Sequence, residues 1–237
     1  MKRLRIGVIY GGRSSEHEVS LASAASIFDQ LNIERYEPVP LFIDKAGSWC
    51  IPNQFPTTKS AGTLIEQSRN NNPLEKVISN EAILLPCPTP ETILTIARDS
   101  SVQGKSVDRA VVRGFSLDVV FPIVHGRYGE DGTLQGLLEL ANIPYVGASV
   151  LSSALAMDKT MAKVHFAAHG LPLVRHMVIS AKDFEQNQDG VINPLELKLG
   201  YPVFVKPANQ GSSVGVSKAT DKNTLRSALA TASNFDD

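Results

Sequence analysis

A buried strand, a glycine-rich turn and a helix follow one another between residues 117 and 141, and this succession limits the fold more than any other stretch. Leu117–Val124 is strongly apolar, which predicts a strand central in a parallel sheet. Residues 125–136 contain four glycines, and Gly132–Ala141 has helical character. Ligands of open α/β sheets bind at the carboxyl ends of the strands. The turn is therefore a candidate ligand site.

The polar residues of this turn are more than a helix start requires. Glu130 and Asp131 could simply be the acidic side chains that a helix dipole favours at its N-terminus. That structural explanation leaves His125, Arg127 and Gln135 unaccounted for.

A similar strand, turn and helix begin the chain. Leu4–Tyr10 is an apolar strand that ends at two glycines, and a helix follows. Its apolar face comprises Val19, Leu21, Ala22, Ala25 and Phe28. Ser15 and Glu18 have the spacing of a capping box, which predicts the helix start there. The turn lacks the third glycine of a dinucleotide fingerprint, and Glu16 taken alone could be only a helix N-terminal acid.

The remaining patterns complete an α/β fold class, with a parallel-sheet domain over residues 1–147 and a second unit over 148–237. Further strands are expected at Tyr36–Ile43 and Ile143–Val146, with a surface insertion at 54–90 that contains a possible strand at 81–85. In the second unit we expect a helix at Ser152–Ala168, a strand at Leu173–Ile179, a polar turn at Gln186–Gly190 and a helix at Pro194–Leu199. A last helix should be capped by Asp221, with an apolar face made of Leu225, Ala228, Leu229 and Ala232.

Lys206 stands at the end of an expected strand, Pro202–Val205, and a loop rich in glycine and serine follows at 211–215. Glycine lets a backbone approach a ligand closely, successive N–H groups can surround anionic oxygens, and the ammonium adds a positive charge. The loop therefore suits a polyphosphate, although a hairpin with a salt-bridged lysine explains the pattern equally well. Val214 and Val216 alternate as in a strand, and the spacing is not that of a Walker A loop.

Composition narrows the classes of function. The net charge is −1 with 20% charged residues, which gives no support to nucleic-acid binding. No apolar run is long enough for a membrane span. Cys50 and Cys87 have no metal or redox spacing, which suits a cytoplasmic location. His165 and His169 are four residues apart on a helix without a third ligand nearby, so no metal ligand is assigned.

Four segments together resemble the D-alanine–D-alanine ligases of the ATP-grasp superfamily. They are residues 11–20, residues 125–136, Met157–Lys159 and Val205–Gly215, in the family's order and spacing. The resemblance covers nearly the whole chain except a variable region at 54–115. It implies a Rossmann-like pre-ATP-grasp domain over 1–147 and an α+β central ATP-grasp subdomain over 148–237. The second subdomain would be incomplete, because the sequences of the family continue past this length.

The resemblance also implies roles for particular residues. Glu16 would hold the ammonium of the first D-alanine, with Val19 and His125 beside that substrate. Ser212 would form a hydrogen bond with Glu16, and these two would be the catalytic residues. The ATP phosphates would be contacted by Lys159, Lys206, Gly211, Ser212, Ser213, Val214 and Gly215.

The implied activity is ATP-dependent joining of two D-alanine molecules through a D-alanyl phosphate, for peptidoglycan synthesis and cell shape. The resemblance implies Mg²⁺ as well as ATP, with the magnesium and adenine sites expected beyond residue 237, and a cytoplasmic homodimer. Two alternatives remain open at this point. One is a related ATP-grasp ligase of the D-alanine–D-lactate type, and the other is a non-catalytic ligand-binding fragment.

Overall fold

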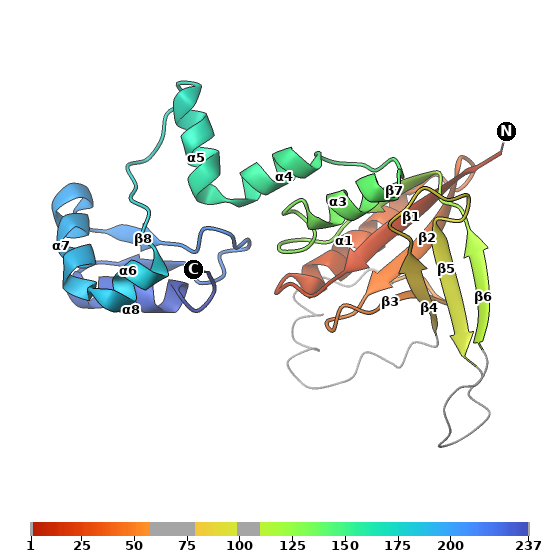
Figure 1. The fold of residues 1–237 in the computed structure, drawn as a ribbon, viewed down its shortest axis with the longest axis horizontal. Coiled ribbons are helices and arrows are strands. Elements are labelled where there is room, and N and C mark those ends of the chain that lie inside the picture. Colours follow the sequence, from red (N-terminus) through yellow and green to blue (C-terminus); the bar gives the residue numbers. More distant parts are fainter. Residues whose placement is uncertain (1, 57–78, 99–109, 237) are drawn as a thin grey trace, which may run out of the picture. The chain divides into compact units, whose positions relative to one another are not determined.

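The computed structural model describes residues 2–56, 79–98 and 110–236 of the 237-residue chain. It divides into two compact units, Met1–Val150 and Leu151–Asp237 (Figure 1). Within the described segments, no helix is long and apolar enough to cross a membrane.

The first unit contains a seven-stranded sheet with the order β6-β5-β4-β3-β2-β1-β7. Strands β1 (Leu4–Gly11), β2 (Tyr36–Ile43) and β7 (Val119–Pro122) are parallel, as the sequence predicts. β7 is not central, because in the described chain its outer side meets only a single bridge, between Val120 and Tyr145. That bridge replaces the expected strand at 143–146.

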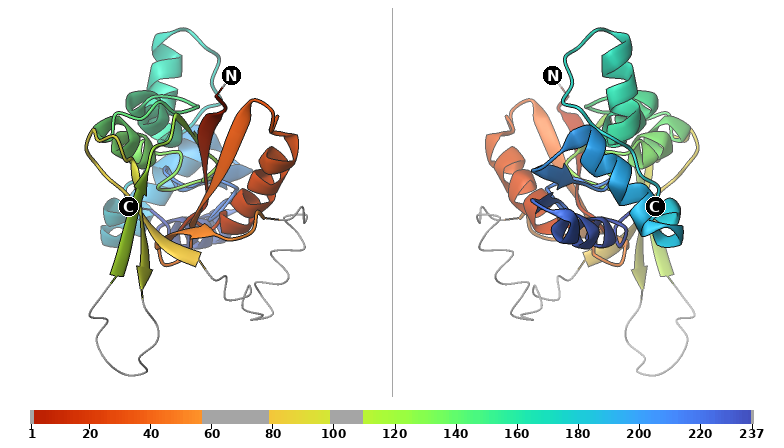
Figure 2. Two further views of the ribbon diagram at one scale, coloured as in Figure 1. Left: turned by 90° about the vertical axis from the view of Figure 1, so that its right-hand side faces the viewer. Right: turned by 90° about the vertical axis from the view of Figure 1, so that its left-hand side faces the viewer.

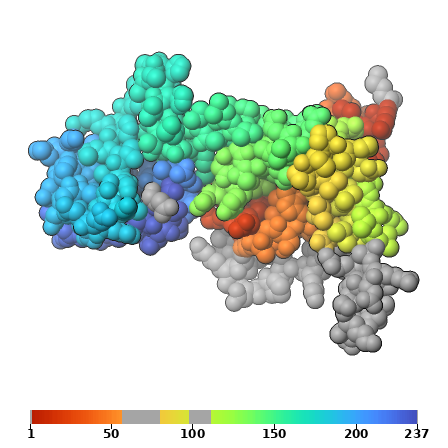
Figure 3. All heavy atoms as spheres, viewed as in Figure 1, coloured from red at the N-terminus to blue at the C-terminus, as the bar shows by residue number. Residues whose placement is uncertain are grey.

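The other half of the sheet is an antiparallel meander that the sequence does not predict. It comprises β3 (Trp49–Pro52), β4 (Ser79–Leu84), β5 (Ile93–Arg98) and β6 (Ala110–Phe115). β4 confirms the possible strand near residue 81, so that part of the expected surface insertion belongs to the sheet; residues 57–78 lie outside the described chain. β4 and β5 are part of the continuous surface of the unit in the space-filling view (yellow in Figure 3).

Alternation along β1 divides the core between the two faces of the sheet. Ile6, Val8 and Tyr10 pack with α1 (His17–Gln30) on one face. Ile9 points to the opposite face and packs in the cluster that includes α3 (Thr133–Leu140). Side chains of a strand alternate between faces, so this short apolar run serves two layers. Figure 2 shows α1 and α3 on opposite sides of the strands.

The second unit is built from helices and one hairpin. The helices are α4 (Val150–Met157), α5 (Lys159–Ala168), α6 (Ala181–Gln186), α7 (Gln188–Leu199) and α8 (Lys222–Ala232), and the hairpin strands are β8 (Val203–Val205) and β9 (Ser217–Ala219). The long helix expected at 152–168 is divided at Asp158, whose carboxylate accepts the Thr160 and Met161 N–H groups and caps α5.

The prediction for α8 is confirmed in detail. Asp221 caps the helix in a reciprocal capping box with Thr224. The four predicted apolar residues, Leu225, Ala228, Leu229 and Ala232, are all buried. The first three pack with Ile192, Leu195 and Phe184 in the core of this unit.

Three other expectations for the second unit are wrong. Residues 171–180 form no strand, because their backbone has no ladder partner in the described chain, although Met177 and Ile179 pack against the core. The polar turn expected at 186–190 is reduced to Asn187, which separates α6 from a longer α7. Val214 and Val216 precede β9 rather than belonging to it.

Candidate active site

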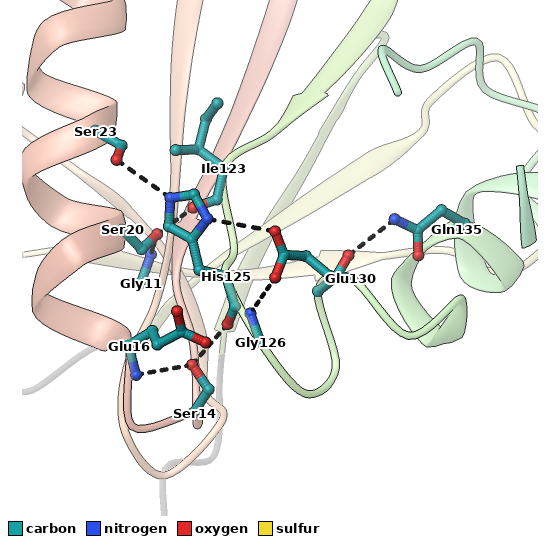
Figure 4. A network of polar contacts seen from close by, with 11 residues as sticks. Gly11, Ser14, Glu16, Ser20, Ser23, Ile123, His125, Gly126, Glu130 and Gln135 are labelled. Carbon is teal, nitrogen blue, oxygen red and sulfur yellow. Dashed lines mark hydrogen bonds and ion pairs between the residues drawn. The ribbon is translucent and has the colours of Figure 1, made fainter. Parts of the chain in front are cut away.

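Two turns at the carboxyl ends of β1 and β7 are joined by Ser14. Its hydroxyl donates to the His125 carbonyl oxygen at 2.7 Å and accepts the Glu16 N–H at 3.2 Å. Figure 4 shows this junction with the Glu16 and His125 side chains beside it. Residues more than a hundred positions apart therefore meet where parallel α/β sheets place their ligands.

The capping box expected from Ser15 and Glu18 does not form. Helix α1 begins at His17, and its N-cap residue is Glu16, which makes no side-chain capping bond. The Glu18 carboxylate instead accepts from Lys45 Nζ at 2.5 Å. A tertiary ion pair has replaced the local cap, because Lys45, in the turn after β2, lies within reach of the first turn of α1.

The Glu16 carboxylate lies against the second turn. Glu16 is only 9% exposed. Gly126 has a φ of +71°, and a Cβ built on it would lie 2.5 Å from Glu16 Oε2. Glycine is therefore required at 126 both by its backbone conformation and by the approach of this carboxylate.

His125 and Glu130 form the second polar pair of the site. His125 Nδ1 lies 3.6 Å from Glu130 Oε1, and His125 Nε2 lies 3.2 Å from the Ser23 hydroxyl on α1. Glu130 Oε2 accepts the Gly126 N–H at 2.8 Å. The Glu130 carboxylate raises the pKa of His125 above its usual 6.5, Glu16 makes a smaller contribution, and burial opposes the rise. The His125 ring in turn lowers the pKa of Glu130.

We expect Glu130→Gln to lower the pKa of His125, measured by NMR titration of the imidazole resonances. With the pair intact, the raised pKa of His125 gives stability that is present below pH about 6.5 and is lost as the pH rises through the folded value. The lowered pKa of Glu130 gives stability that is lost as the pH falls through that value. An unchanged His125 titration in Glu130→Gln would show that the pair does not interact.

The other polar residues of the turn support its shape. Gln135 Nε2 donates to the Gly129 carbonyl at 2.8 Å, and its buried Oε1 has no hydrogen-bond partner among the described residues. Asp131 accepts the Tyr128 and Thr133 N–H groups, which confirms the helix-start explanation for this one acid. Arg127 is exposed, with its guanidinium 5.8 Å from the centre of the Tyr128 ring.

Sequence reasoning missed two buried polar residues of α1. The Ser20 hydroxyl is fully buried, accepts the Gly11 N–H at 2.8 Å and donates to the Ile123 carbonyl. His17 Nδ1 lies 2.7 Å from the Gly12 carbonyl oxygen, and burial lowers the pKa of this histidine. Their spacing of three places both on one helix face, a polar pattern where an apolar one is usual. Val19 is half-buried on the same helix.

We expect Ser20→Ala to destabilise the chain by about 1–3 kcal/mol, because the Gly11 N–H and the Ile123 carbonyl lose a buried partner. In a chain of this size, each kcal/mol lowers Tm by about 2–4 °C. The matched control is Ser26→Ala, since the Ser26 hydroxyl is exposed and bonds only within α1. Equal effects of the two substitutions on thermal unfolding would contradict the role of Ser20.

A second group of candidate residues lies in the second unit, at the ends of β8 and α5. Lys159 is the first residue of α5, and its Nζ donates to the Ala208 carbonyl at 3.2 Å and to the Gln210 carbonyl. Burial lowers the pKa of Lys159, and the positive charge of Lys206 lowers it further. β8 and β9 form the hairpin of the structural explanation, but the exposed Lys206 has no ion pair with any described residue, so the salt bridge of that explanation is not seen there.

The glycine loop, residues 211–215, consists of turns. The Val214 N–H donates to the Gly211 carbonyl, and the Val216 N–H donates to the Ser213 carbonyl. Ser212 and Ser213 have φ values of 43° and 61°, a region that non-glycine residues seldom occupy and that concentrates at ligand sites. Ser212 and Glu16 belong to different units, so the expected hydrogen bond between them stays a prediction.

The two lysines fit the charge of a polyphosphate, because the two ammonium groups repel each other and an anion would relieve that repulsion. Among the described residues, no group of three histidine, cysteine, aspartate or glutamate side chains could hold a metal ion. The described part of the chain therefore does not provide a magnesium site. His169 Nδ1 lies 2.8 Å from the His165 carbonyl oxygen.

Family models match both units of the chain. The model described as D-ala D-ala ligase N-terminus matches residues 5–148, and the model described as D-ala D-ala ligase C-terminus matches residues 165–237. The D-alanine–D-alanine ligase of Natranaerobius thermophilus is 39% identical over 100% of the chain, and that of Halothermothrix orenii is 40% identical over 97%. The chain covers 58% of each relative.

Solved structures give the same result. The D-alanine–D-alanine ligase from Coxiella burnetii is 32% identical, with a TM-score of 0.72. The VanG D-Ala:D-Ser ligase from Enterococcus faecalis is 31% identical, with a TM-score of 0.71. Each match covers 99% of this chain and 62% or 61% of the solved chain, so the sequence spans less than two thirds of these proteins. The fold class is confirmed, and the chain belongs to the D-alanine–D-alanine ligase family.

Proposed function

We propose that this chain carries the first-substrate site and the phosphate site of an ATP-dependent ligase that forms D-alanyl-D-alanine for peptidoglycan. The observation that carries the proposal is the buried Glu16 carboxylate at the start of α1, held against the turn that contains His125 and Gly126. Membership of the ligase family supports the choice of substrate.

In this proposal Glu16 binds the ammonium group of the first D-alanine. A charge-assisted hydrogen bond from the ammonium to the Glu16 carboxylate would fix the orientation of the amino acid. His125, held by Glu130 and Ser23, lies beside the bound substrate, and half-buried Val19 contributes an apolar contact.

The phosphate chain of ATP is bound in the second unit. Lys159 and Lys206 neutralise charge on the phosphate oxygens, and residues 211–215 close over them with backbone N–H groups and the Ser212 and Ser213 hydroxyls. Replacing the loop carbonyls by phosphate at the Lys159 ammonium would give this half-buried cation an anionic partner. We also propose, from the family resemblance alone, that Ser212 forms a hydrogen bond with Glu16.

The reaction then requires positioning and charge neutralisation. A carboxylate oxygen of the first D-alanine attacks the γ-phosphorus of ATP, releasing ADP and forming D-alanyl phosphate. The amine of the second D-alanine, having lost its proton, attacks the acyl carbon, and inorganic phosphate leaves. Orientation of the carboxylate by Glu16, and of the phosphates by the two lysines, makes the first step effectively intramolecular.

Several parts of the proposal rest on family membership alone. They are magnesium as the cation that accompanies ATP, and a cytoplasmic homodimer. The division of the chain into domains at residues 147 and 148 is supported by the nearby boundary between the two compact units, at Val150 and Leu151. The described residues are assigned no part in binding the metal.

The proposal is tested with a form of the protein that has the full length of its relatives. We expect ADP release that depends on D-alanine and not on L-alanine. Adding D-lactate or D-serine with limiting D-alanine identifies the second substrate, since a mixed product would favour the D-alanine–D-lactate alternative or a VanG-like specificity. Binding of ATP and D-alanine without turnover would favour the non-catalytic alternative and would overturn the proposed reaction.

A further inference from the structure

We infer that the segment following α8, Phe235–Asp236, is a loop clamp that holds the glycine loop in its phosphate-binding position, with Asp236 as the positioning residue. The inference rests on the proposed phosphate site and adds to it a residue that the four family-like segments do not contain. Asp236 is assigned no contact with the nucleotide and acts through the residues of the loop.

Asp236 holds the first arm of the loop, residues 207–210, through Asn209. The Asn209 N–H donates to Asp236 Oδ2 at 2.7 Å. The Asn209 side-chain amide donates to the same carboxylate, at 3.2 Å to Oδ2 and 3.4 Å to Oδ1. One carboxylate thus binds both the backbone and the side chain of a single loop residue, which fixes its orientation as well as its position.

Phe235 contacts both arms of the loop. Its carbonyl oxygen accepts Gln210 Nε2 at 3.1 Å, on the first arm. On the second arm Gly215 has a φ of +69°, and a Cβ built there would lie 2.7 Å from the Phe235 ring and 2.8 Å from Pro207. The backbone of Gly215 is therefore packed between these two rings. The clamp meets the loop on either side of residues 211–214.

The clamp also positions the Lys159 ammonium. The Lys159 ammonium donates to the carbonyls of Ala208 and Gln210, the two residues that flank Asn209. The Asp236 charge raises the pKa of Lys159, opposing the effect of Lys206. Fixing Asn209 consequently fixes the carbonyls that hold the ammonium, so loop and lysine are positioned together.

Removing the Asp236 charge has two opposite consequences for an anion. Less negative charge near Lys159 favours phosphate by a Coulomb term that solvent screens. Loss of the clamp lowers the fraction of chains whose loop is competent to bind, and apparent affinity falls in proportion to that fraction. Because three charge-assisted hydrogen bonds meet on one carboxylate, we expect the loss of order to dominate.

The test uses the 237-residue chain with inorganic tripolyphosphate, a probe that needs only the phosphate site. The dissociation constant is measured from amide chemical shifts. We expect Asp236→Asn and Asp236→Glu each to weaken binding about five- to tenfold, because the first loses the charge-assisted bonds and the second displaces the carboxylate. Asn209→Ala, which keeps every charge, should weaken it by a smaller factor.

The matched control is Asp189→Asn. It removes one carboxylate from the same unit, but its ion pairs go to Lys222 and Arg226 rather than to the loop. We expect its affinity for tripolyphosphate to equal or exceed that of the unaltered chain. The Tm of each variant is measured to distinguish a loss of loop order from a loss of global stability. We expect the Asp236 and Asn209 variants to have nearly the Tm of the unaltered chain.

Two results overturn the inference. If Asp236 acts only by its charge, Asp236→Asn will bind tripolyphosphate more tightly and Asp236→Glu will match the unaltered chain. If the unaltered chain shows no shift at residues 206–215, both the clamp and the proposed phosphate site fail. If the unaltered chain binds tripolyphosphate tightly and every Asp236 variant binds it equally well, the clamp is contradicted. The proposed phosphate site is then unaffected.

Discussion

Glu16→Gln is expected to lower kcat/KM for the first D-alanine by about ten- to a hundredfold, in a form of the protein with the full length of its relatives. The substitution keeps the size of the side chain and removes its charge. A hydrogen bond to a charged group contributes about 1.5–3 kcal/mol, and about 1.4 kcal/mol corresponds to a factor of ten in rate. The Michaelis constant for ATP should change much less.

The control for this prediction lies two residues along the same helix. Glu18→Gln makes the same chemical change, but the Glu18 carboxylate pairs with Lys45 rather than lying against Gly126. We expect Glu18→Gln to alter stability and to leave the D-alanine term near that of the unaltered enzyme. D-Alanine and ATP are titrated separately on all three forms. If Glu16→Gln changes kcat/KM for ATP and not kcat/KM for D-alanine, Glu16 has only a structural role at the helix start.

The start of helix α1 shows what the local sequence could and could not predict. The spacing of Ser15 and Glu18 is that of a capping box, yet the residue that orders the turn is Ser14, through the carbonyl of His125. Glu18 is drawn instead to Lys45. A capping pattern describes interactions within a few residues, and here tertiary partners compete for the same groups. For helix α8 the described residues include no such tertiary competitor, and its predicted cap at Asp221 forms.

The limits of the strand predictions have a different cause. Alternation at 173–179 indicates an extended segment with one apolar face, and Met177 and Ile179 do pack inward. A strand also needs a neighbouring backbone, which periodicity cannot supply. Conversely, β5 pairs with β4 on one side and with β6 on the other, although the sequence analysis predicted no strand at 93–98 or 110–115.

The candidate site was predictable where its chemistry is carried by charged residues beside glycine. His125, Glu16 and Lys206 stand in such turns, and the structure brings the first two together. The buried support behind them was not predictable. Ser20 and the Asp236 carboxylate act through backbone groups of residues remote in sequence, and a hydrogen bond to a distant backbone leaves no periodic or compositional signal.

Lys206→Ala is expected to lower kcat/KM for ATP by about ten- to a hundredfold in the full-length form, with a much smaller change in the D-alanine term. The exposed Lys206 ammonium has no ion pair in the described chain, so its loss removes no structural partner there. A charge-assisted bond to phosphate, about 1.5–3 kcal/mol, is what disappears. Lys218→Ala is the matched control, because Lys218 is an exposed lysine on the neighbouring strand β9.

A second measurement on the same variant tests the electrostatics without turnover. Lys206 lowers the pKa of Lys159 in the intact chain, so Lys206→Ala should raise that pKa, observed in the NMR titration of the Lys159 side chain. Lys218→Ala should leave it unchanged. A lower kcat/KM for ATP together with a raised Lys159 pKa is the result expected if the two lysines bind the same anion. Unaltered kinetics with an unaltered Lys159 titration would show that the two ammonium groups do not act on a common site.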